Sequence, residues 1–293
     1  TEVQELFNDG VALDATTHSK KDYLMGYWRN DGISSWVDRA PEKMAFDGTD
    51  DRVRYGNLIN GFTSLTMASW FRVNTSSSTQ NDIIGQFTNT TTIGARLQSR
   101  AGSAGIWWAT GNGSSSTLAI YSDSGAHRDG NWHHVVGTYD GSTLKLYFDG
   151  ATTPVATASS SSLTFNDTNG FDIGGTYPEY MDGNIDECAL WNTALTGTEV
   201  AELYALGLDG NILTHSNQTN LVSYWKNEGI TTASWADKKG SNNPSSVAGS
   251  PTLIGGNNGT PAGTPESITI REGLNSNKDG LGFPFKNDDR NVL

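Results

Sequence analysis

The chain has 293 residues, of which 34 are glycine and only 17% are charged, a composition typical of a β-sandwich with many tight turns. Its formal net charge of −13 disfavours nucleic acid as a partner, because an acidic surface repels phosphates. The one cysteine, Cys188, excludes an internal disulfide framework, and no apolar run has the length of a transmembrane helix, so we expect no membrane insertion.

In chain order, the first residues are notable because they recur later at a constant spacing. The repeated segments are Thr1–Phe7, Thr17–Ser19 and Leu24–Ile33, which return as Thr198–Tyr204, Thr214–Ser216 and Leu221–Ile230. A period of about 200 residues is too long for a solenoid unit and favours a tandem array of whole domains. The alternative is a duplicated linker in a complete protein.

Residue pairs that favour tight turns recur along the chain. Asp-Gly or Asn-Gly pairs begin at Asp31, Asp47, Asn60, Asp129, Asp140, Asp149, Asn169 and Asp182. Short alternating runs lie between them, including Leu65–Val73, Trp132–Tyr139 and Thr143–Phe148. The last two are joined through Asp140 and should form a hairpin. Strands spaced in this way predict an antiparallel sandwich or jelly roll.

One short helix is predicted near residues 198–206. Thr196 and Glu199 have the spacing of a capping box, in which each side chain bonds the backbone of the other. They open an apolar face formed by Val200, Leu203 and Tyr204.

The segment after this helix holds too few strands for two further sheets. Residues 220–235 contain one predicted strand, and a stretch rich in Pro, Gly, Ser and Asn follows from Asn242 to Glu266. Unpaired strands expose their edges, so we expect residues 220–235 to dock on the preceding domain or on a neighbouring subunit. A chain truncated at Ser216 is then expected to stay folded and to lose assembly.

The apolar residues of these runs predict the core. We expect burial of Met25, Tyr27, Trp70, Trp132, Val136, Leu146, Phe148, Ile173 and Leu190, with Tyr27 and Trp28 in an early strand. On this basis, Trp132→Ala should cost about 3–5 kcal/mol through cavity formation.

Several motifs occur in an order that resembles a known family. They are Phe46–Val53, Thr66–Phe71, Asn131–Gly141, Leu144–Gly150, Ile173–Gly175 and Met181–Thr196. Together they resemble the laminin-G-like, concanavalin-A-like jelly roll in the variant shared with pentraxins. The resemblance implies an all-β, antiparallel two-sheet sandwich with one short helix. We therefore predict a tail of a preceding unit or linker at 1–19, a jelly roll at 20–206, and a linker with the partial start of a following unit at 207–293.

A catalytic site is not indicated. Glycosidases of this fold place carboxylates in the pattern E-x-D-x-x-E on one strand. The nearest match starts with Asn184 and lacks the last acid, while Asp186 and Glu187 are adjacent and should face opposite ways. We therefore expect no enzymatic activity.

Calcium is the predicted metal, since the loop after Asp47 is rich in the oxygen ligands that this ion prefers. In the resembled family this turn lies near the Ile-Asp-Glu strand, which makes Asp47 and Asp186 candidate ligands and Asp182 a reserve. The alternative is that Asp47 and Asp182 merely begin turns and that Asp186 bonds a neighbouring strand.

Sugar binding needs an exposed aromatic ring beside polar groups. Trp107 and Trp108 are the first candidates, because strand alternation turns one of the two rings out of the core. Tyr177 and Tyr180 form a second candidate pair. The alternative is that an outward indole lies under a loop without any ligand.

These observations favour a non-enzymatic structural or adhesive protein built from tandem laminin-G-like domains. The flanking Tyr-Trp-Arg/Lys-Asn elements resemble repeat-bearing surface and virion proteins, which implies an extracellular, virion-surface or cell-surface location. Its partners would be neighbouring copies or other structural subunits, and surface glycans. The alternatives are a carbohydrate-binding lectin-type module and a glycoside-hydrolase-like enzyme.

Overall fold

The computed structural model describes residues 43–254 apart from 76, 78–79, 89–92, 102–104, 162, 164, 167–168, 177 and 209, together with two short strands. The chain divides into a unit of Thr1–Ala40 with Ala262–Leu293 and a larger unit of Pro41–Pro261. In the smaller unit, β1 (Trp28–Arg29) pairs antiparallel with β2 (Val37–Asp38). A strand is present at Trp28, as predicted, but it pairs with β2 rather than with a strand of the larger unit. Met25 and Tyr27 lie outside the described residues.

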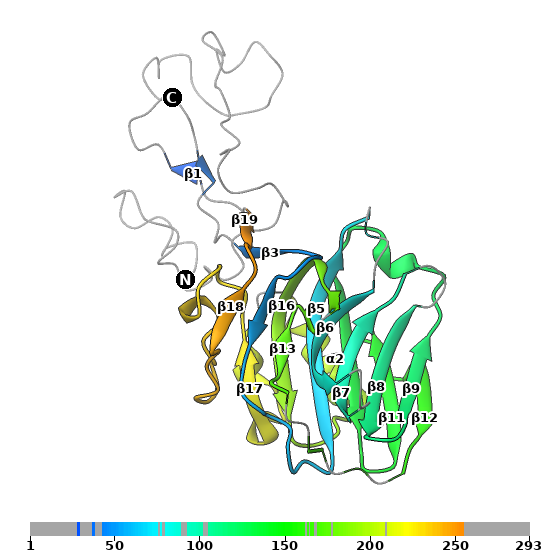
Figure 1. Ribbon diagram of the computed structural model, residues 1–293. Helices are drawn as coiled ribbons and strands as arrows, with labels where there is room; N and C mark the ends of the chain where they lie inside the picture. The colour runs from blue at the N-terminus through cyan, green and yellow to red at the C-terminus, as the bar shows by residue number, and fades with distance from the viewer. Residues whose placement is uncertain are drawn as a thin grey trace, which may run out of the picture. The chain divides into compact units, whose positions relative to one another are not determined.

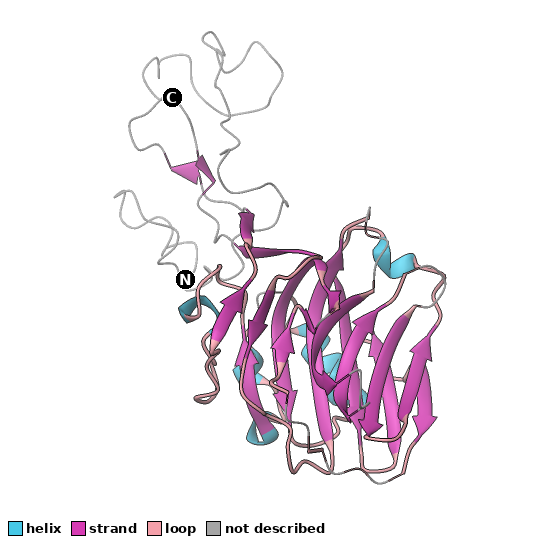
Figure 2. Cartoon of the chain, in the orientation of Figure 1, coloured by secondary structure: helices cyan, strands magenta, loops and turns pink. Residues whose placement is uncertain are grey.

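The larger unit contains two antiparallel sheets (Figures 1 and 2). The eight-stranded sheet has the order β12 (Ala156–Ser159), β11 (Thr143–Phe148), β10 (His133–Tyr139), β5 (Leu65–Val73), β16 (Asp182–Trp191), β3 (Lys43–Asp47) and β19 (Thr252–Ile254), and β17 (Leu221–Trp225) also pairs with β16. The seven-stranded sheet has the order β18 (Ser246–Ala248), β4 (Arg52–Arg54), β13 (Asp172–Ile173), β6 (Asn81–Thr88), β7 (Ile93–Ser99), β8 (Ile106–Asn112) and β9 (Ser116–Tyr121). The strands β14 (Gly175–Thr176) and β15 (Glu179–Tyr180) form a separate two-stranded ribbon. The two large antiparallel sheets confirm the predicted sandwich class.

The core lies between the two sheets, where alternate residues of facing strands meet. The predicted core residues Val136, Leu146, Ile173 and Leu190 are buried. Trp70, Trp132 and Phe148 are only half-buried, which corrects the prediction for these three. Trp132 precedes β10 and packs against the Arg72 guanidinium at 5.6 Å, so its removal would open a smaller cavity than predicted.

The predicted hairpin and helix are both present. β10 and β11 pair from Val135↔Phe148 to Tyr139↔Leu144, and the Asp140 carboxylate accepts hydrogen bonds from the amides of Ser142 and Thr143 in the turn. The single α-helix of the described part of the chain, α2 (Gly197–Ala205), begins with the Thr196/Glu199 capping box. Short 3₁₀ turns lie at Ala126–Arg128, Ile212–Thr214, Gln218–Asn220 and Ala233–Trp235.

Helix α2 covers part of the outer face of the eight-stranded sheet. Val200 and Leu203 pack there with Ala68, Val136 and Trp191, forming a second, smaller apolar cluster. Within the described residues, no helix is both long and apolar enough to cross a membrane.

The segment after the helix belongs to the same core. β17 pairs with β16, and the rings of Trp225 and Tyr55 lie 4.7 Å apart. Trp235 contacts Phe46 at 6.1 Å, while β18 and β19 each pair with one of the two sheets. The observed unit therefore extends well past Leu206, the predicted end of the jelly roll. Residues 220–235 thus dock on the preceding jelly roll, one of the two expected arrangements. We now expect a chain truncated at Ser216 to lose its fold, because it would lose these core rings.

Candidate functional site

The outward face of the seven-stranded sheet carries a row of side chains from four strands. Asp82 on β6 pairs with Gln98 on β7, Gln98 with Trp107 on β8, and Trp107 with Ile120 on β9. We call these four residues the Trp107 row. The neighbouring residues Leu97, Trp108 and Ala119 belong to the core, so alternation directs the Trp107 row away from it.

The two adjacent indoles have opposite environments. Trp108 is fully buried, and its Nε1 donates a hydrogen bond to the Thr138 carbonyl at 2.9 Å. The candidate role of Trp108 in sugar binding is therefore wrong. Trp107 is half-buried, and the Arg100 guanidinium lies 4.0 Å from the centre of its ring, a cation–π contact.

The second aromatic pair does not form an exposed platform. Tyr177 lies outside the described residues, and Tyr180 is 9% exposed. The Tyr180 hydroxyl accepts a hydrogen bond from Arg52 at 3.4 Å, and the Arg52 guanidinium lies 5.9 Å from the ring centre. Because its ring is enclosed, Tyr180 can support the site but cannot stack a sugar, which corrects its predicted role.

A polar network adjoins Trp107. Gln98 Nε2 donates to Asp82 at 2.6 Å and to Glu179 at 2.9 Å, while its carbonyl accepts from Arg100 at 2.6 Å. Arg96 Nη1 bridges the same two carboxylates, at 3.2 Å from Asp82 and 2.6 Å from Glu179. Burial raises the pKa of Asp82 to about 7, and the nearby Glu179 adds to this rise.

Local sequence patterns do not indicate this network, because its members come from distant strands. Arg96, Gln98 and Arg100 alternate along one segment, a pattern that could have indicated a polar outward face. Glu179 reaches them from the β14–β15 ribbon, a placement that no local pattern indicates. The result is a half-buried indole flanked by fixed donors and acceptors, the combination of groups that polar ring-shaped ligands need.

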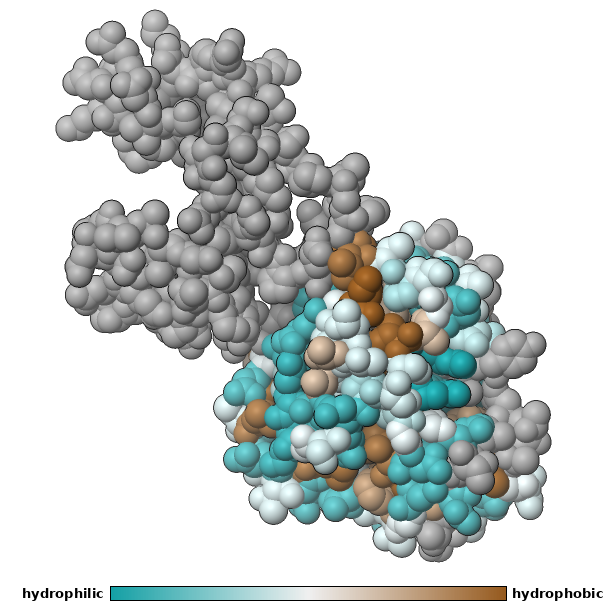
Figure 3. Space-filling view, turned by 60° about the vertical axis from the view of Figure 1, so that its left-hand side comes forward, coloured by the Kyte–Doolittle hydropathy of each residue, from teal (hydrophilic) through white to brown (hydrophobic). Residues whose placement is uncertain are grey.

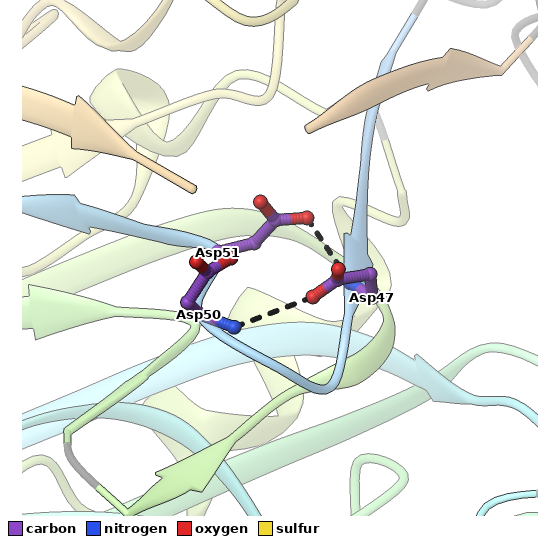
Figure 4. A group of neighbouring side chains, drawn as sticks. All are labelled: Asp47, Asp50 and Asp51. Atoms are coloured by element: carbon purple, nitrogen blue, oxygen red, sulfur yellow. Dashed lines mark hydrogen bonds between the residues drawn. The ribbon is translucent and has the colours of Figure 1, made fainter. Parts of the chain in front are cut away.

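An acidic loop follows β3. Ligand oxygens of Asp47, Asp50 and Asp51 lie within 4.8 Å of one another (Figure 4). Asp47 Oδ1 accepts from the amides of Thr49 at 2.8 Å and Asp50 at 3.4 Å, which is an ordinary turn contact. Asp51 is buried, and its Oδ2 accepts from the Asp47 amide at 3.1 Å, whereas its Oδ1 has no hydrogen-bond partner. Burial and the Asp47 charge raise the pKa of Asp51 to about 6.

The other two predicted metal ligands, Asp182 and Asp186, bond protein groups outside the acidic loop. Asp182 pairs with Asp47 across β16 and β3, and its carboxylate accepts a hydrogen bond from the Asn74 amide. Asp186 is fully buried, forms an ion pair with Lys43, and accepts from the Asn227 and Glu187 amides at 2.8 Å each. Because the Asp186 carboxylate is enclosed by these donors, its candidate role as a calcium ligand is wrong.

The Asp186–Glu187 step is a bulge rather than a regular strand. The register of β16 on β5 shifts between Asp186 and Ala189, and Glu187 has a φ of 51°, which few non-glycine residues adopt. Both acids are therefore buried, and the expected alternation fails here. Glu187 lies 3.3 Å from Lys226 and accepts from the Tyr224 hydroxyl, so both acids bind the segment that includes β17.

Comparison with known proteins agrees with this architecture. The model of the concanavalin A-like lectin/glucanases superfamily matches residues 47–201. The chain belongs to this superfamily. No curated protein sequence matches the chain.

The solved structures that resemble the chain are only distantly similar to it. A proposed carbohydrate-binding protein from Bacteroides ovatus superposes with a TM-score of 0.53 at 17% identity, covering 75% of this chain and 61% of that one. The chain thus spans about three fifths of that protein's length. A heptameric SAP-like pentraxin from Limulus polyphemus gives a TM-score of 0.46 at 17% identity, covering 66% of this chain and 94% of the pentraxin. Domain 4 of an extracellular arabinanase from Geobacillus stearothermophilus, solved with arabinotriose, gives 0.42 at 14% identity, with coverages of 62% and 82%.

Proposed function

We propose that the chain is a non-enzymatic adhesive protein and that its jelly roll binds glycans through the Trp107 row. The observation that carries this proposal is the half-buried Trp107 ring with Arg100 at 4.0 Å, beside the network of Gln98 and Glu179. A sugar can stack one apolar face on the indole while its hydroxyls bond the fixed polar groups. The carbohydrate-binding assignment of the Bacteroides ovatus protein is consistent with this use of the fold.

We further propose that the protein works as a tandem array on a virion or cell surface. The repeat of Leu24–Ile33 at Leu221–Ile230 supports this, because the later copy contributes β17 to a jelly roll. Hydrophilic side chains predominate over the described residues in Figure 3, with hydrophobic side chains in several separate areas between them. Neighbouring copies or other structural subunits would be the assembly partners.

Trp107→Ala is expected to weaken glycan binding by at least about tenfold, because the central aromatic contact would be lost. The measurement is a glycan array with the intact chain, followed by titration of the best ligand. Ile230→Ala is the matched control, since Ile230 is also exposed but lies outside the Trp107 row. Equal binding by the Trp107→Ala and Ile230→Ala proteins would contradict the proposed site.

The network also bears on the alternative of a glycoside hydrolase. Such an enzyme needs two carboxylates on either side of a scissile bond. Asp82 and Glu179 are instead bridged by a single Arg96 nitrogen and by Gln98, and Asp82 is buried. This arrangement favours binding over hydrolysis. Cleavage of a β-glucan by the intact chain, abolished by Glu179→Gln, would support the enzyme instead.

We also propose that the acidic loop binds calcium through Asp47, Asp50 and Asp51. An ion that binds only the folded state must raise the melting temperature, so excess calcium should stabilise the chain relative to EDTA. In EDTA, Asp51→Asn should raise the melting temperature, because it removes a buried carboxylate whose Oδ1 has no partner. The same variant should lose the calcium response.

Asp140→Asn is the matched control for the calcium experiment. Asp140 also closes a turn, but it lies outside the acidic loop, so this variant should keep the calcium response. If the parent chain melts at the same temperature in calcium and in EDTA, the acidic loop does not bind calcium.

A further inference from the structure

A second aromatic and polar row lies on the outward face of the eight-stranded sheet. Arg72 on β5 pairs with Asn184 on β16, and Trp132 lies on the other side of Arg72, one residue before β10. Arg72 Nε and Nη2 both donate to Asn184 Oδ1, at 3.2 and 2.6 Å. With the Trp132 ring 5.6 Å from the guanidinium, these contacts hold the Arg72 side chain in one position. We call Trp132, Arg72 and Asn184 the Arg72 row.

More aromatic surface adjoins the Arg72 row. Trp70 lies two residues before Arg72 on the same strand and therefore on the same face. Its ring stacks on Tyr204 of α2, with centroids 5.3 Å apart and an angle of 21° between the planes. Trp70 and Trp132 are half-buried and Tyr204 is 37% exposed, so this face presents rings to solvent where α2 does not cover the sheet.

The charge of Arg72 has no acidic partner within the described ranges. Burial alone lowers its pKa, with no carboxylate acting on it. Arg54, Arg100 and Arg128 differ, because each interacts with at least one carboxylate. By strand register the nearest acids on this face are Asp182 and Asp186, each two residues from Asn184. Asp182 is bonded by Asn74 and its charge acts on Arg128, while Asp186 forms an ion pair with Lys43. In a chain of net charge −13, Arg72 is thus a partly dehydrated cation held by a neutral amide and an indole ring.

We propose that the Arg72 row is a second binding site, which takes a sugar bearing a carboxylate. A guanidinium matches a carboxylate with paired hydrogen bonds, and the fixed position of Arg72 lowers the entropic cost of forming them. The flanking rings stack on the apolar face of the sugar. A neutral sugar would leave the guanidinium unpaired, and a polyanion would be repelled by the acidic chain. This site is separate from the Trp107 row, and the proposal does not depend on that row binding glycans.

The test uses the full chain with ¹⁵N-labelled tryptophan, and sodium glucuronate and glucose as matched probes. Glucuronate should shift the indole N–H signals of Trp132 and Trp70 in a saturable manner, and glucose should not. Arg72→Gln should weaken glucuronate binding by about tenfold, the loss expected for a charge-assisted hydrogen bond. Arg54→Gln is the matched control, because Arg54 is already paired with Asp172 and lies on the other sheet.

The indole spectrum also reports folding, so a variant that misfolds is recognised directly. If Arg72→Gln misfolds, Arg72→Lys keeps the charge without the planar fork and should show an intermediate loss. Trp107→Ala should leave glucuronate binding unchanged. The proposal is overturned if glucuronate gives no saturable shift of the Trp132 and Trp70 signals, or if glucose shifts these two signals equally. It is also overturned if the Arg72 variants bind glucuronate as tightly as the parent chain. Loss of glucuronate binding in Trp107→Ala would also overturn it, while supporting the site on the seven-stranded sheet.

Discussion

Trp225→Ala is expected to lower the free energy of unfolding by about 3–5 kcal/mol, the range for removing a fully buried large ring. Trp225 is completely buried and packs against Tyr55 at 4.7 Å and Phe171 at 5.4 Å. Its Nε1 also donates to the Asn242 carbonyl at 3.0 Å, so the substitution orphans one acceptor as well. Urea unfolding followed by circular dichroism measures the change.

Tyr204→Ala provides the comparison for Trp225→Ala. Tyr204 is also a large ring, but it lies on α2 at the surface with 37% exposure, so its loss should cost much less. If both variants lose similar stability, or if Trp225→Ala is nearly neutral, then the segment that contains β17 is not part of the core. Deletion of the chain from Ser216 onward should abolish the cooperative transition altogether, since it also removes Trp235.

Asp186→Asn is expected to destabilise the fold by about 3–5 kcal/mol, because it removes one charge of the buried Lys43–Asp186 pair. Asp186 is fully buried, and the side chain of Lys43 is only 7% exposed. Asparagine keeps an oxygen that can accept from the Asn227 and Glu187 amides, so the loss reports mainly the ion pair. Thermal and urea unfolding of the intact chain measure it.

A second substitution separates charge from packing at this site. Adding Lys43→Met to Asp186→Asn removes the second charge of the buried pair as well and should restore at least half of the lost stability. Lys145→Met is the control, because Lys145 and Asp140 form a partly exposed pair and should contribute little. No recovery in the double variant would show that Asp186 stabilises the fold through its backbone contacts rather than through Lys43.

Asn227 explains why these residues act together. Its Oδ1 accepts from the Met44 amide at 2.7 Å, and its Nδ2 donates to the carbonyls of Met44 and Ile185 at 2.9 and 3.0 Å. One side chain therefore bridges β3 and β16 beyond the point where their backbones pair. The Tyr-Trp-Lys-Asn motif at Tyr224–Asn227 thus has a structural role.

The sequence was most informative where the structure depends on local contacts. The Asp140 turn, the β10–β11 hairpin and the capping box of α2 follow from neighbouring residues, and each was predicted correctly. The order of motifs from Phe46 to Thr196 identified the fold because it samples many strands at once. Strand alternation likewise predicted that one of the two adjacent indoles must face outward.

Only the tertiary structure decided which distant groups meet. It placed Trp108 in the core and Trp107 outside, because the register of β8 on β7 and β9 fixes the outward face. It joined Asp186 to Lys43, although 143 residues separate them, and so removed Asp186 from the metal candidates. It also brought Glu179 to Arg96 and Trp132 to Arg72. Such pairings depend on the order of the strands in each sheet and on the bulge at Glu187. Local sequence specifies neither feature, because the free energy that selects the strand order and register comes from burial across the whole sandwich.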